Sequence, residues 1–438
     1  MTRREAGLVL GVLGILVAVT VPELGSGAWP FHPRAGAIDP QGPLGLLVKA
    51  ADRDFDVALL RSAALVAGLG LVIVGAVSLT VRIVPRWLVM LAAAGVVGLL
   101  LVPATSLQVG LRDATEPWYH VNDSTYQIEI AGDLVLDGDD PYGHDYRGSG
   151  LEKWYPAAGA DEDVPRVALD HFAYFPGTVL TAAAWRLLPN PFDDYRFFVL
   201  LCTIGLGLAV FLFEIPLYWK LALGAALAAN PLAVRAAWFG TADAPSLLLT
   251  ALAFALVARS RYLLAAAALA GAVLVKQFAL VAAPFLVVAL LTRAVPRPVL
   301  YRAAAVFAGM IVAGIVPFAI ADPGALWDDT IAYGAQTYRI IGYGLAGVLL
   351  EAGILEDRFG PYPFLWLALA LWLPFTAWLA WNQWRARRLW IGAASFAASI
   401  FVLVYLGRVF QTSYLIWPLT GLLVSFALAS ARDASARS

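Results

Sequence analysis

The fold class of this chain follows from residues 57–81, which read VALLRSAALVAGLGLVIVGAVSLTV. The stretch carries a single charge, Arg61. A helix needs about 20 apolar residues to cross the hydrocarbon core of a bilayer. In lipid, a helix satisfies every backbone N–H and C=O within its own segment. Residues 57–81 therefore predict a transmembrane helix.

The same pattern recurs along all 438 residues, of which 61% are hydrophobic and only 14% charged. Soluble chains have about 25% charged residues. We therefore predict one all-α, polytopic transmembrane domain over residues 1–438, with about twelve membrane segments. The segments are 6–21, 57–81, 87–107, 195–213, 217–236, 243–258, 262–275, 278–292, 299–320, 362–381, 389–406 and 412–430. The first could instead be a signal peptide, because its apolar run is short and follows Arg3 and Arg4.

The short connections between these segments that carry arginine and lysine all fall on one side of the predicted membrane. Positive connections stay in the cytoplasm, so both termini are predicted to be cytoplasmic and the protein to lie in the cell membrane. The two long connections, residues 108–194 and 321–361, are then extracytoplasmic.

The long connection 108–194 holds 16 acidic residues against 5 basic ones. It is also rich in proline and glycine, so we expect irregular backbone and short helices lying at the membrane surface. A long acidic loop on one face is a frequent place for a functional site. The alternative is a solvated spacer.

Motifs for soluble cofactor chemistry are absent. His32, His120, His144 and His171 all fall outside, but they lack the spacing of a zinc site and there is no HExxH. The acidic runs 52–56 and 137–140 are similar to cation ligands, although Gly138 and Pro141 favour a turn in the second run. We expect no cofactor and no metal. The net charge of −1 gives no field that would attract nucleic acid.

Two short apolar segments, 262–275 and 278–292, flank Lys276 and Gln277. At 1.5 Å per residue, neither spans the roughly 30 Å of hydrocarbon. They predict a hairpin that rises from the cytoplasm and turns below the outer surface, with Lys276 pointing into a cavity. The alternative is that Lys276 extends to the outer interface.

Three more charged residues lie at a similar predicted depth. They are Arg235, Asp243 and Arg408. Charges inside a membrane are costly and usually functional, and together with Lys276 they predict a phosphate-binding cavity. For each of them taken alone, anchoring at the interface is the competing interpretation.

The outer string VNDSTYQIEIAGDLVLDGDDPY, residues 121–142, resembles the first-loop signature of the GT-C glycosyltransferases. It is most similar to family 87, the polyprenyl-phosphate-mannose-dependent mannosyltransferases. The matching positions are Asp123, Tyr126, Ala131, Gly138, Pro141 and Tyr142. Further similar strings are HFAYFPG at 171–177, FGTADAPSLLL at 239–249 and AGAVLVKQFALVAAP at 270–284.

The resemblance covers residues 121–284 and reaches the C-terminal helices only through hydropathy. Thr241 stands where the family has Gln, and Phe175-Pro176-Gly177 replaces Tyr-Pro-Pro. Two helices precede the one that leads into the Asp-bearing loop, whereas the family usually has that loop after its first helix.

The resemblance implies a GT-C-like fold and an inverting sugar transfer, with mannose the expected sugar. Asp123 would be the general base that takes the proton of the acceptor hydroxyl. The acceptor would be an extracytoplasmic glycolipid, polysaccharide or protein. The polyprenyl-phosphate donor would be bound through cations that stabilise its phosphate, Lys276, Arg235 and Arg408. The expected substrate contacts are His171, Tyr126, Tyr174 and Asp243.

Other interpretations remain open at this point. Asp123 could be a helix N-cap, because it precedes an amphipathic stretch. About twelve helices with internal cations also suit a transporter or a flippase of lipid-linked sugars. A non-catalytic scaffold would use the acidic loop as a docking surface.

Overall fold

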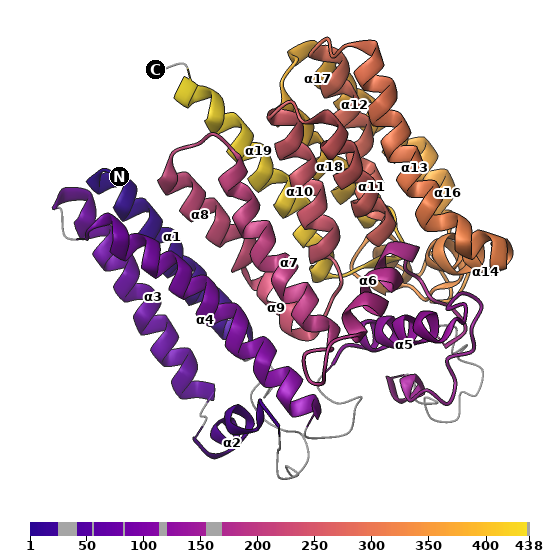
Figure 1. Cartoon of the computed structure of the whole chain (residues 1–438), viewed down its shortest axis with the longest axis horizontal. Helices are drawn as coiled ribbons and strands as arrows, with labels where there is room; N and C mark the ends of the chain where they lie inside the picture. The colour runs from indigo at the N-terminus through magenta and orange to yellow at the C-terminus, as the bar shows by residue number, and fades with distance from the viewer. Residues whose placement is uncertain (25–41, 55–56, 82–83, 114–120, 155–168, 436–438) are drawn as a thin grey trace. The chain divides into compact units, whose positions relative to one another are not determined.

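The computed structural model describes residues 1–24, 42–54, 57–81, 84–113, 121–154 and 169–435 (Figure 1). It is 78% helical with 1% strand, which confirms the predicted all-α class. The described residues form two compact units, which the sequence had not separated. The first comprises residues 1–125, 187–244 and 429–438, and the second comprises 126–186 and 245–428.

Eight helices of the described chain are long and apolar enough to cross a membrane. They are Arg3–Val21, Ser62–Thr80, Arg86–Asp113, Tyr195–Leu212, Arg297–Ala321, Phe364–Ala386, Leu389–Leu406 and Thr412–Ala431. A ninth span results if Leu217–Ala228 and Pro231–Phe239, bent by 48°, count as one. The other three predicted segments are helical but shorter: Ala244–Ala258, Tyr262–Val275 and Gln277–Thr292. Every predicted segment is thus a helix, and eight or nine of the twelve are long enough to span.

The first unit contains most of the helices at the N-terminal end of the chain. They are α1 (Arg3–Leu24), α2 (Gly45–Asp54), α3 (Val57–Thr80), α4 (Arg86–Asp113), the start of α5 (Asp123–Asp137), α7 (Tyr195–Ala209), η3 (Val210–Leu212), α8 (Leu217–Ala228) and α9 (Pro231–Phe239).

In the first unit, α1 and α3 pack side by side (Figure 1). Glycines of both helices lie at the contact. A Cβ added to Gly14 would lie 2.5 Å from the carbonyl oxygen of Gly68, and one added to Gly7 would lie 2.5 Å from that of Gly75. The backbones approach so closely because these four positions have no side chain. Small residues play this role widely between membrane helices.

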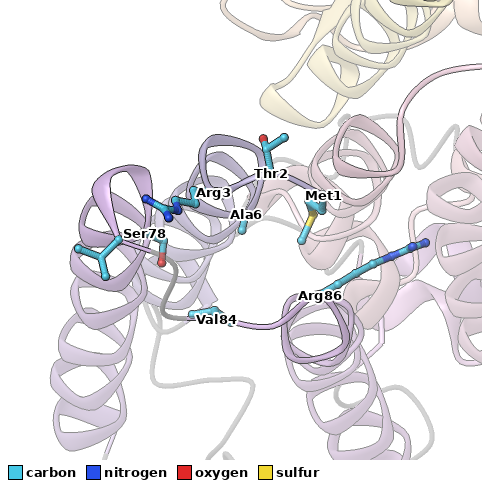
Figure 2. A pocket seen from close by; sticks show the side chains of 8 residues that line it. Met1, Thr2, Arg3, Ala6, Ser78, Val84 and Arg86 are labelled. Atoms are coloured by element: carbon cyan, nitrogen blue, oxygen red, sulfur yellow. The ribbon is translucent and has the colours of Figure 1, made fainter.

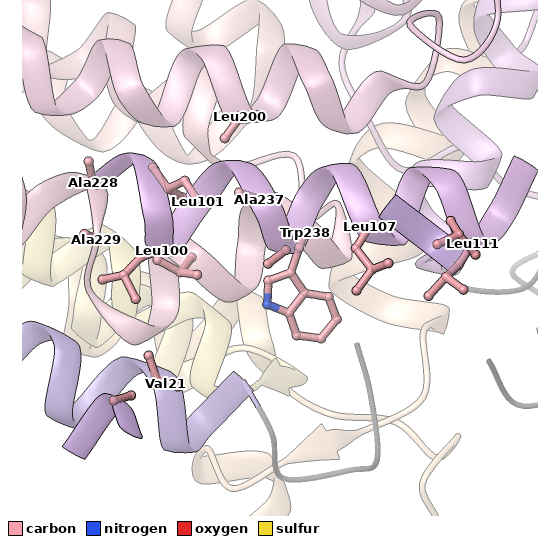
Figure 3. Close-up of a cluster of buried hydrophobic side chains, with 14 residues drawn as sticks. Val21, Leu100, Leu101, Leu107, Leu111, Leu200, Ala228, Ala229, Ala237 and Trp238 are labelled. Carbon is pink, nitrogen blue, oxygen red and sulfur yellow. The ribbon is translucent and has the colours of Figure 1, made fainter. Parts of the chain in front are cut away.

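A buried apolar cluster holds α4 against its neighbours in the same unit (Figure 3). Leu101 of α4 is fully buried, and Trp238 of α9 is 4% exposed. The partner helices contribute the small side chains of Ala228, Ala229 and Ala237 to this cluster, so the leucines of α4 can pack close to their backbones. The ends of α4 and α9 are fixed by this packing.

The second unit holds the remaining elements. They are the rest of α5, η1 (Leu151–Trp154), α6 (Pro176–Arg186), α10 (Ala244–Ala258), α11 (Tyr262–Val275), η4 (Gln277–Ala282), α12 (Ala283–Thr292), α13 (Arg297–Ala321), α14 (Pro323–Trp327), the π-helix η5 (Asp328–Thr337), β1 (Ile341–Gly342), α15 (Leu345–Glu351), α16 (Phe364–Leu367), the π-helix η6 (Ala368–Trp372), α17 (Leu373–Ala386), α18 (Leu389–Leu406), β2 (Val409–Phe410), η7 (Thr412–Leu415) and most of α19 (Ile416–Ser435).

The predicted break in the membrane helices occurs at Lys276. This residue is extended (φ −148°, ψ 122°) between α11 and η4. At the far end of α12, Arg293 donates to the backbone carbonyl of Val257, at the end of α10. The chain therefore returns to the side from which α11 starts, as the hairpin prediction requires.

The start of α6 is fixed against this break. The Thr178 hydroxyl donates to the carbonyl of Val275 at 2.6 Å. Gly177 has no side chain, and a Cβ there would lie 2.6 Å from the backbone of Leu274. The residues before α6, including His171 and Tyr174, are thereby held close to Lys276.

Candidate functional site

The eight residues predicted for the site divide between the two units. Those in the second unit are Tyr126, His171, Tyr174, Lys276 and Arg408, and those in the first are Asp123, Arg235 and Asp243. The acidic run 52–56 and both His32 and His120 lie wholly or partly outside the described residues.

His171 is paired with a buried carboxylate in the second unit. Its Nδ1 lies 2.6 Å from Oδ1 of Asp329, whose side chain is 2% exposed. The other carboxylate oxygen of Asp329 accepts the backbone N–H of Gly143 at 2.9 Å. The imidazole stacks on Tyr333, with ring centroids 4.7 Å apart and planes 26° apart. The ring is thus fixed in both position and rotation.

This arrangement leaves one edge of the imidazole for chemistry. With Nδ1 facing a carboxylate, the neutral ring carries its proton on Nδ1, and Nε2 is an acceptor. The side chain of His171 is 23% exposed. Within the described chain, no hydrogen bond is made by Nε2. A carboxylate that orients a histidine in this way is the arrangement of a general base in hydrolytic triads.

Asp329 was missed by the sequence reasoning. It belongs to the π-helix η5, in the connection 321–361 that the sequence predicts to be extracytoplasmic, and lies 158 residues from His171. The only available signal was the acidic pair Asp328-Asp329 in an otherwise apolar neighbourhood. π-helical turns are rare and frequently found at functional sites.

Lys276 lies among aromatic rings. Its Nζ is 5.9 Å from the ring centroid of Tyr174, 5.6 Å from that of Phe278 and 5.9 Å from that of Tyr414. Cations are attracted to aromatic faces at such distances. The predicted contact residues Tyr174 and Lys276 are therefore brought together by the fold.

Lys276 and the His171–Asp329 pair belong to one neighbourhood. Gln277, next to Lys276, donates from its side-chain amide to the carbonyl of Thr330, next to Asp329, at 3.3 Å. Gln127 of α5 donates to the carbonyl of His171 at 2.8 Å. Segments from α5, the α6 start, the α11 break and η5 thus meet at this place.

Two further groups of the acidic loop border the pair. The Tyr142 hydroxyl donates to the carbonyl of Tyr174 at 2.9 Å, and burial raises the pKa of this phenol well above its ordinary value. Burial also raises the pKa of Asp140, and the charges of Asp322 and Asp329 add to the effect. Oδ2 of Asp140 is buried, and in the described part of the chain it accepts no hydrogen bond. The favoured turn at 137–140 is confirmed, because α5 ends at Asp137 and Gly138 has φ +89°.

Arg408 has a different environment from the one expected. Its Nε donates to the carbonyl of Tyr338 at 2.6 Å, and its two terminal nitrogens donate to the carbonyls of Gly360 and Arg358. Burial lowers the pKa of this guanidinium from its ordinary value. Tyr338 in turn contacts Tyr333 edge-on. Arg408 thus supports the ring on which His171 stacks, and its hydrogen bonds go to backbone rather than to an open cavity.

The remaining predicted residue of the second unit, Tyr126, lies along α5. Its hydroxyl donates to the carbonyl of Ser149 at 2.9 Å, and its ring is 5.0 Å from that of Trp154. Its contacts order the loop that follows α5.

Asp123 is the first residue of α5 and lies in the first unit. Its Oδ1 accepts the backbone N–H of Ser124 at 2.8 Å, and Asn122 accepts the same N–H at 2.8 Å. The start of the helix is tied to the end of α9, because the N–H of Asn122 donates to the carbonyl of Phe239. Asn122, the residue before the helix, is therefore the N-cap, rather than Asp123 as one interpretation of the sequence had it.

The other two predicted residues of the first unit lie near the end of α9. Arg235 is exposed, with its guanidinium 5.8 Å from the ring of Phe239. Asp243 is 2% exposed, in the turn before α10.

A buried ion-pair group in the first unit was also missed. Asp194 caps α7 and pairs with Arg196 at 2.7 Å and with Arg112 at 2.8 Å. Burial alone would raise the pKa of Asp194, but the charges of Arg196 and Arg112 outweigh it and hold that pKa far below its ordinary value. Arg196 is fully buried. The sequence offered no signal for this group beyond the acidic pair Asp193-Asp194 before an apolar run.

In the described ranges, no three His, Cys, Asp or Glu side chains are grouped as metal ligands would be. Comparisons of the chain with family models, with curated proteins and with solved structures find no match.

Proposed function

We propose that this protein is a membrane-embedded transferase that moves a sugar from a polyprenyl-phosphate donor to an extracytoplasmic hydroxyl. One observation carries the proposal. A lysine at a break between membrane helices lies in the same neighbourhood as a histidine oriented by a buried aspartate. The cation suits a phosphate and the histidine suits a proton transfer.

Lys276 is the proposed contact for the donor phosphate. A lipid donor keeps its headgroup at the membrane surface, and a helix break just below that surface gives a cation access to it. In a water-poor site this charge would stabilise the leaving phosphate as the anomeric C–O bond breaks. The rings of Tyr174, Phe278 and Tyr414 supply faces against which a sugar or an isoprene unit can pack.

We propose that Nε2 of His171 takes the proton of the acceptor hydroxyl. The acceptor oxygen then forms the new bond to the anomeric carbon, and the phosphate departs with the electrons of the broken bond. Asp329 is a positioning residue that holds the ring and the Nδ1 proton. The resemblance assigns the role of base to Asp123, which stays the competing assignment. We also propose that the sugar is mannose and that the protein is related to family 87. Both proposals rest on the resemblance of residues 121–284 to that family.

The test is sugar transfer by the purified full chain in nanodiscs, with a panel of polyprenyl-phosphate sugars and a mixed acceptor pool. Transfer from at least one donor is expected. Lys276→Ala should weaken donor binding at least tenfold, and Lys276→Arg should recover part of it because the charge is kept.

Lys220→Ala is the matched control, since Lys220 also lies over an aromatic ring, Phe211 at 5.8 Å, but on the predicted cytoplasmic side. Equal loss in the two alanine variants would contradict a specific phosphate contact. Movement of labelled lipid across the bilayer without transfer would indicate a flippase instead.

A further inference from the structure

A second place in the molecule has the features of an anion site, independently of the proposed reaction. Within the first unit, the starts of α1 and α4 and the end of α3 surround a small hollow that is open to solvent (Figure 2). Arg3, Ser78 and Arg86 are among the residues that line it. The basic residues nearby predict that this end of the helices is cytoplasmic.

Ser78 carries the first part of the argument. It is 1% exposed, and its hydroxyl has no hydrogen-bond partner among the described residues. A buried hydroxyl without a partner is costly. Two residues further along α3, the Thr80 hydroxyl is satisfied by the carbonyl of Val77 at 3.0 Å. Ser78 lines the hollow instead, where its hydroxyl could donate a hydrogen bond to an acceptor that enters.

Positive potential at the hollow has two sources. Nη1 of Arg3 donates to the carbonyl of Thr80 at 3.1 Å, which holds the guanidinium on the same wall as Ser78 (Figure 2). Two long helices, α1 and α4, begin here, and the N-terminal ends of helices attract anions. Arg86 forms the opposite wall, and its guanidinium extends away from the hollow in Figure 2. The nearby acid, Glu5, accepts the backbone N–H of Thr2 at 2.6 Å.

We propose that this hollow binds the phosphate group of an anionic phospholipid. The Ser78 hydroxyl and the free donors of Arg3 would hold the phosphate oxygens. A lipid is favoured over free phosphate because the rim is apolar and exposed: Leu79 is 43%, Val81 55% and Trp87 63% exposed. Acyl chains can lie on these side chains, and Trp is typical of the membrane interface.

The test measures thermal unfolding of the purified full chain in detergent, with added phosphatidylglycerol, phosphatidylcholine or inorganic phosphate. Phosphatidylglycerol should raise the unfolding temperature in a saturable way, because a ligand that binds only the folded state stabilises it. Ser78→Ala should unfold at the same or a higher temperature without lipid, since it removes the unpaired hydroxyl. Its apparent affinity for phosphatidylglycerol should fall about tenfold, the effect of one hydrogen bond to a charged group.

Arg3→Gln should weaken lipid binding similarly, and Arg4→Gln is its neighbour control, because Arg4 is exposed and does not line the hollow. Unchanged lipid affinity in Ser78→Ala would overturn the site. So would an equal response to phosphatidylcholine, or equal losses in the two arginine variants. Equal stabilisation by inorganic phosphate at millimolar concentration would overturn the lipid as the source of the phosphate.

Discussion

Asp194 in the first unit and Asp329 in the second are buried carboxylates with opposite surroundings. Asp194 faces two guanidiniums, of Arg112 and Arg196, and accepts from Arg196 through both oxygens. Asp329 faces one imidazole and one backbone N–H. Arginine stays charged at all relevant pH values, whereas histidine changes its protonation in the physiological range.

The difference separates a structural carboxylate from one that can take part in chemistry. The two arginine partners of Asp194 join the end of α4 to the start of α7, so these ion pairs fix the two helices and involve no group that exchanges a proton near neutral pH. The partner of Asp329 is His171, whose second ring nitrogen, Nε2, does not face the carboxylate and can exchange a proton with another group. Both carboxylates are buried, so the chemical identity of the partner is what distinguishes them.

The largest effect is expected from Asp329→Asn. In this variant the amide oxygen of the new asparagine would accept the N–H of Gly143. Its NH₂ group would then face His171 and donate to Nδ1. The imidazole proton would then move to Nε2, which could no longer accept the proton of an acceptor hydroxyl. Turnover should fall about 10²–10⁴-fold with little change in donor KM. Steady-state sugar transfer at varied donor concentration measures both.

The control for this variant is Asp123→Asn, which should stay near wild type if His171 is the base. A large loss in Asp123→Asn, with full activity in Asp329→Asn, would return the role of base to Asp123. Nitrogen-15 NMR of labelled histidines reads the tautomer of His171 without any turnover, so the pair can be tested even if no donor is found.

The second largest effect is expected on stability, from Asp194→Asn. It leaves the buried Arg196 guanidinium without its carboxylate, and breaking a buried pair in this way costs about 3–5 kcal/mol. Chemical or thermal unfolding in detergent would measure the loss. Asp170→Asn is the matched control, because its pair with Arg147 is about half exposed and such pairs contribute about 0–1 kcal/mol. Similar losses in both variants would contradict the structural role of Asp194.

Gly14→Leu extends the comparison from charges to backbone packing. The new side chain would push α1 away from the carbonyl of Gly68, and overpacking typically costs about 1–3 kcal/mol. Gly11→Leu, on the same helix, has nothing within 4 Å of the added Cβ and should change stability little. Unfolding temperatures of the two variants provide the measurement. A tolerated Gly14→Leu would mean that the α1–α3 contact is dispensable.

The smallest effect is expected from Asp140→Asn, near the His171–Asp329 pair. The pKa of Asp140 is raised in the folded state, so the stability that its protonation confers is present below the unfolded value, about 3.9. That stability is lost as the pH rises through the folded pKa. The asparagine variant keeps the acceptor for the N–H of Tyr142 and should be slightly more stable than wild type at pH 7, by less than about 1 kcal/mol. The advantage should disappear near pH 4, and an advantage that is constant with pH would contradict this account.

Most of the helical architecture could be predicted because its cause is local. In lipid, a run of apolar residues must satisfy its own backbone, so hydropathy alone located the helices, including α11 and α18 at their observed bounds. The break at Lys276 was predictable for the same reason, because the two flanking runs are too short to span. Of the three predicted segments that are too short to span, 262–275 and 278–292 were expected to be so, whereas 243–258 was not.

The partners of the site residues were decided by the tertiary structure. His171 and Tyr174 were predicted as substrate contacts because the string HFAYFPG, residues 171–177, resembles a segment of the GT-C family. Asp329 could not be assigned to His171, and Arg408 could not be assigned to the carbonyls of Tyr338, Arg358 and Gly360. Those pairings join segments from 48 to 158 residues apart. A hydrogen bond depends on which helix ends meet, and that follows from side-chain packing, such as Gly177 against Leu274, rather than from the composition of either segment.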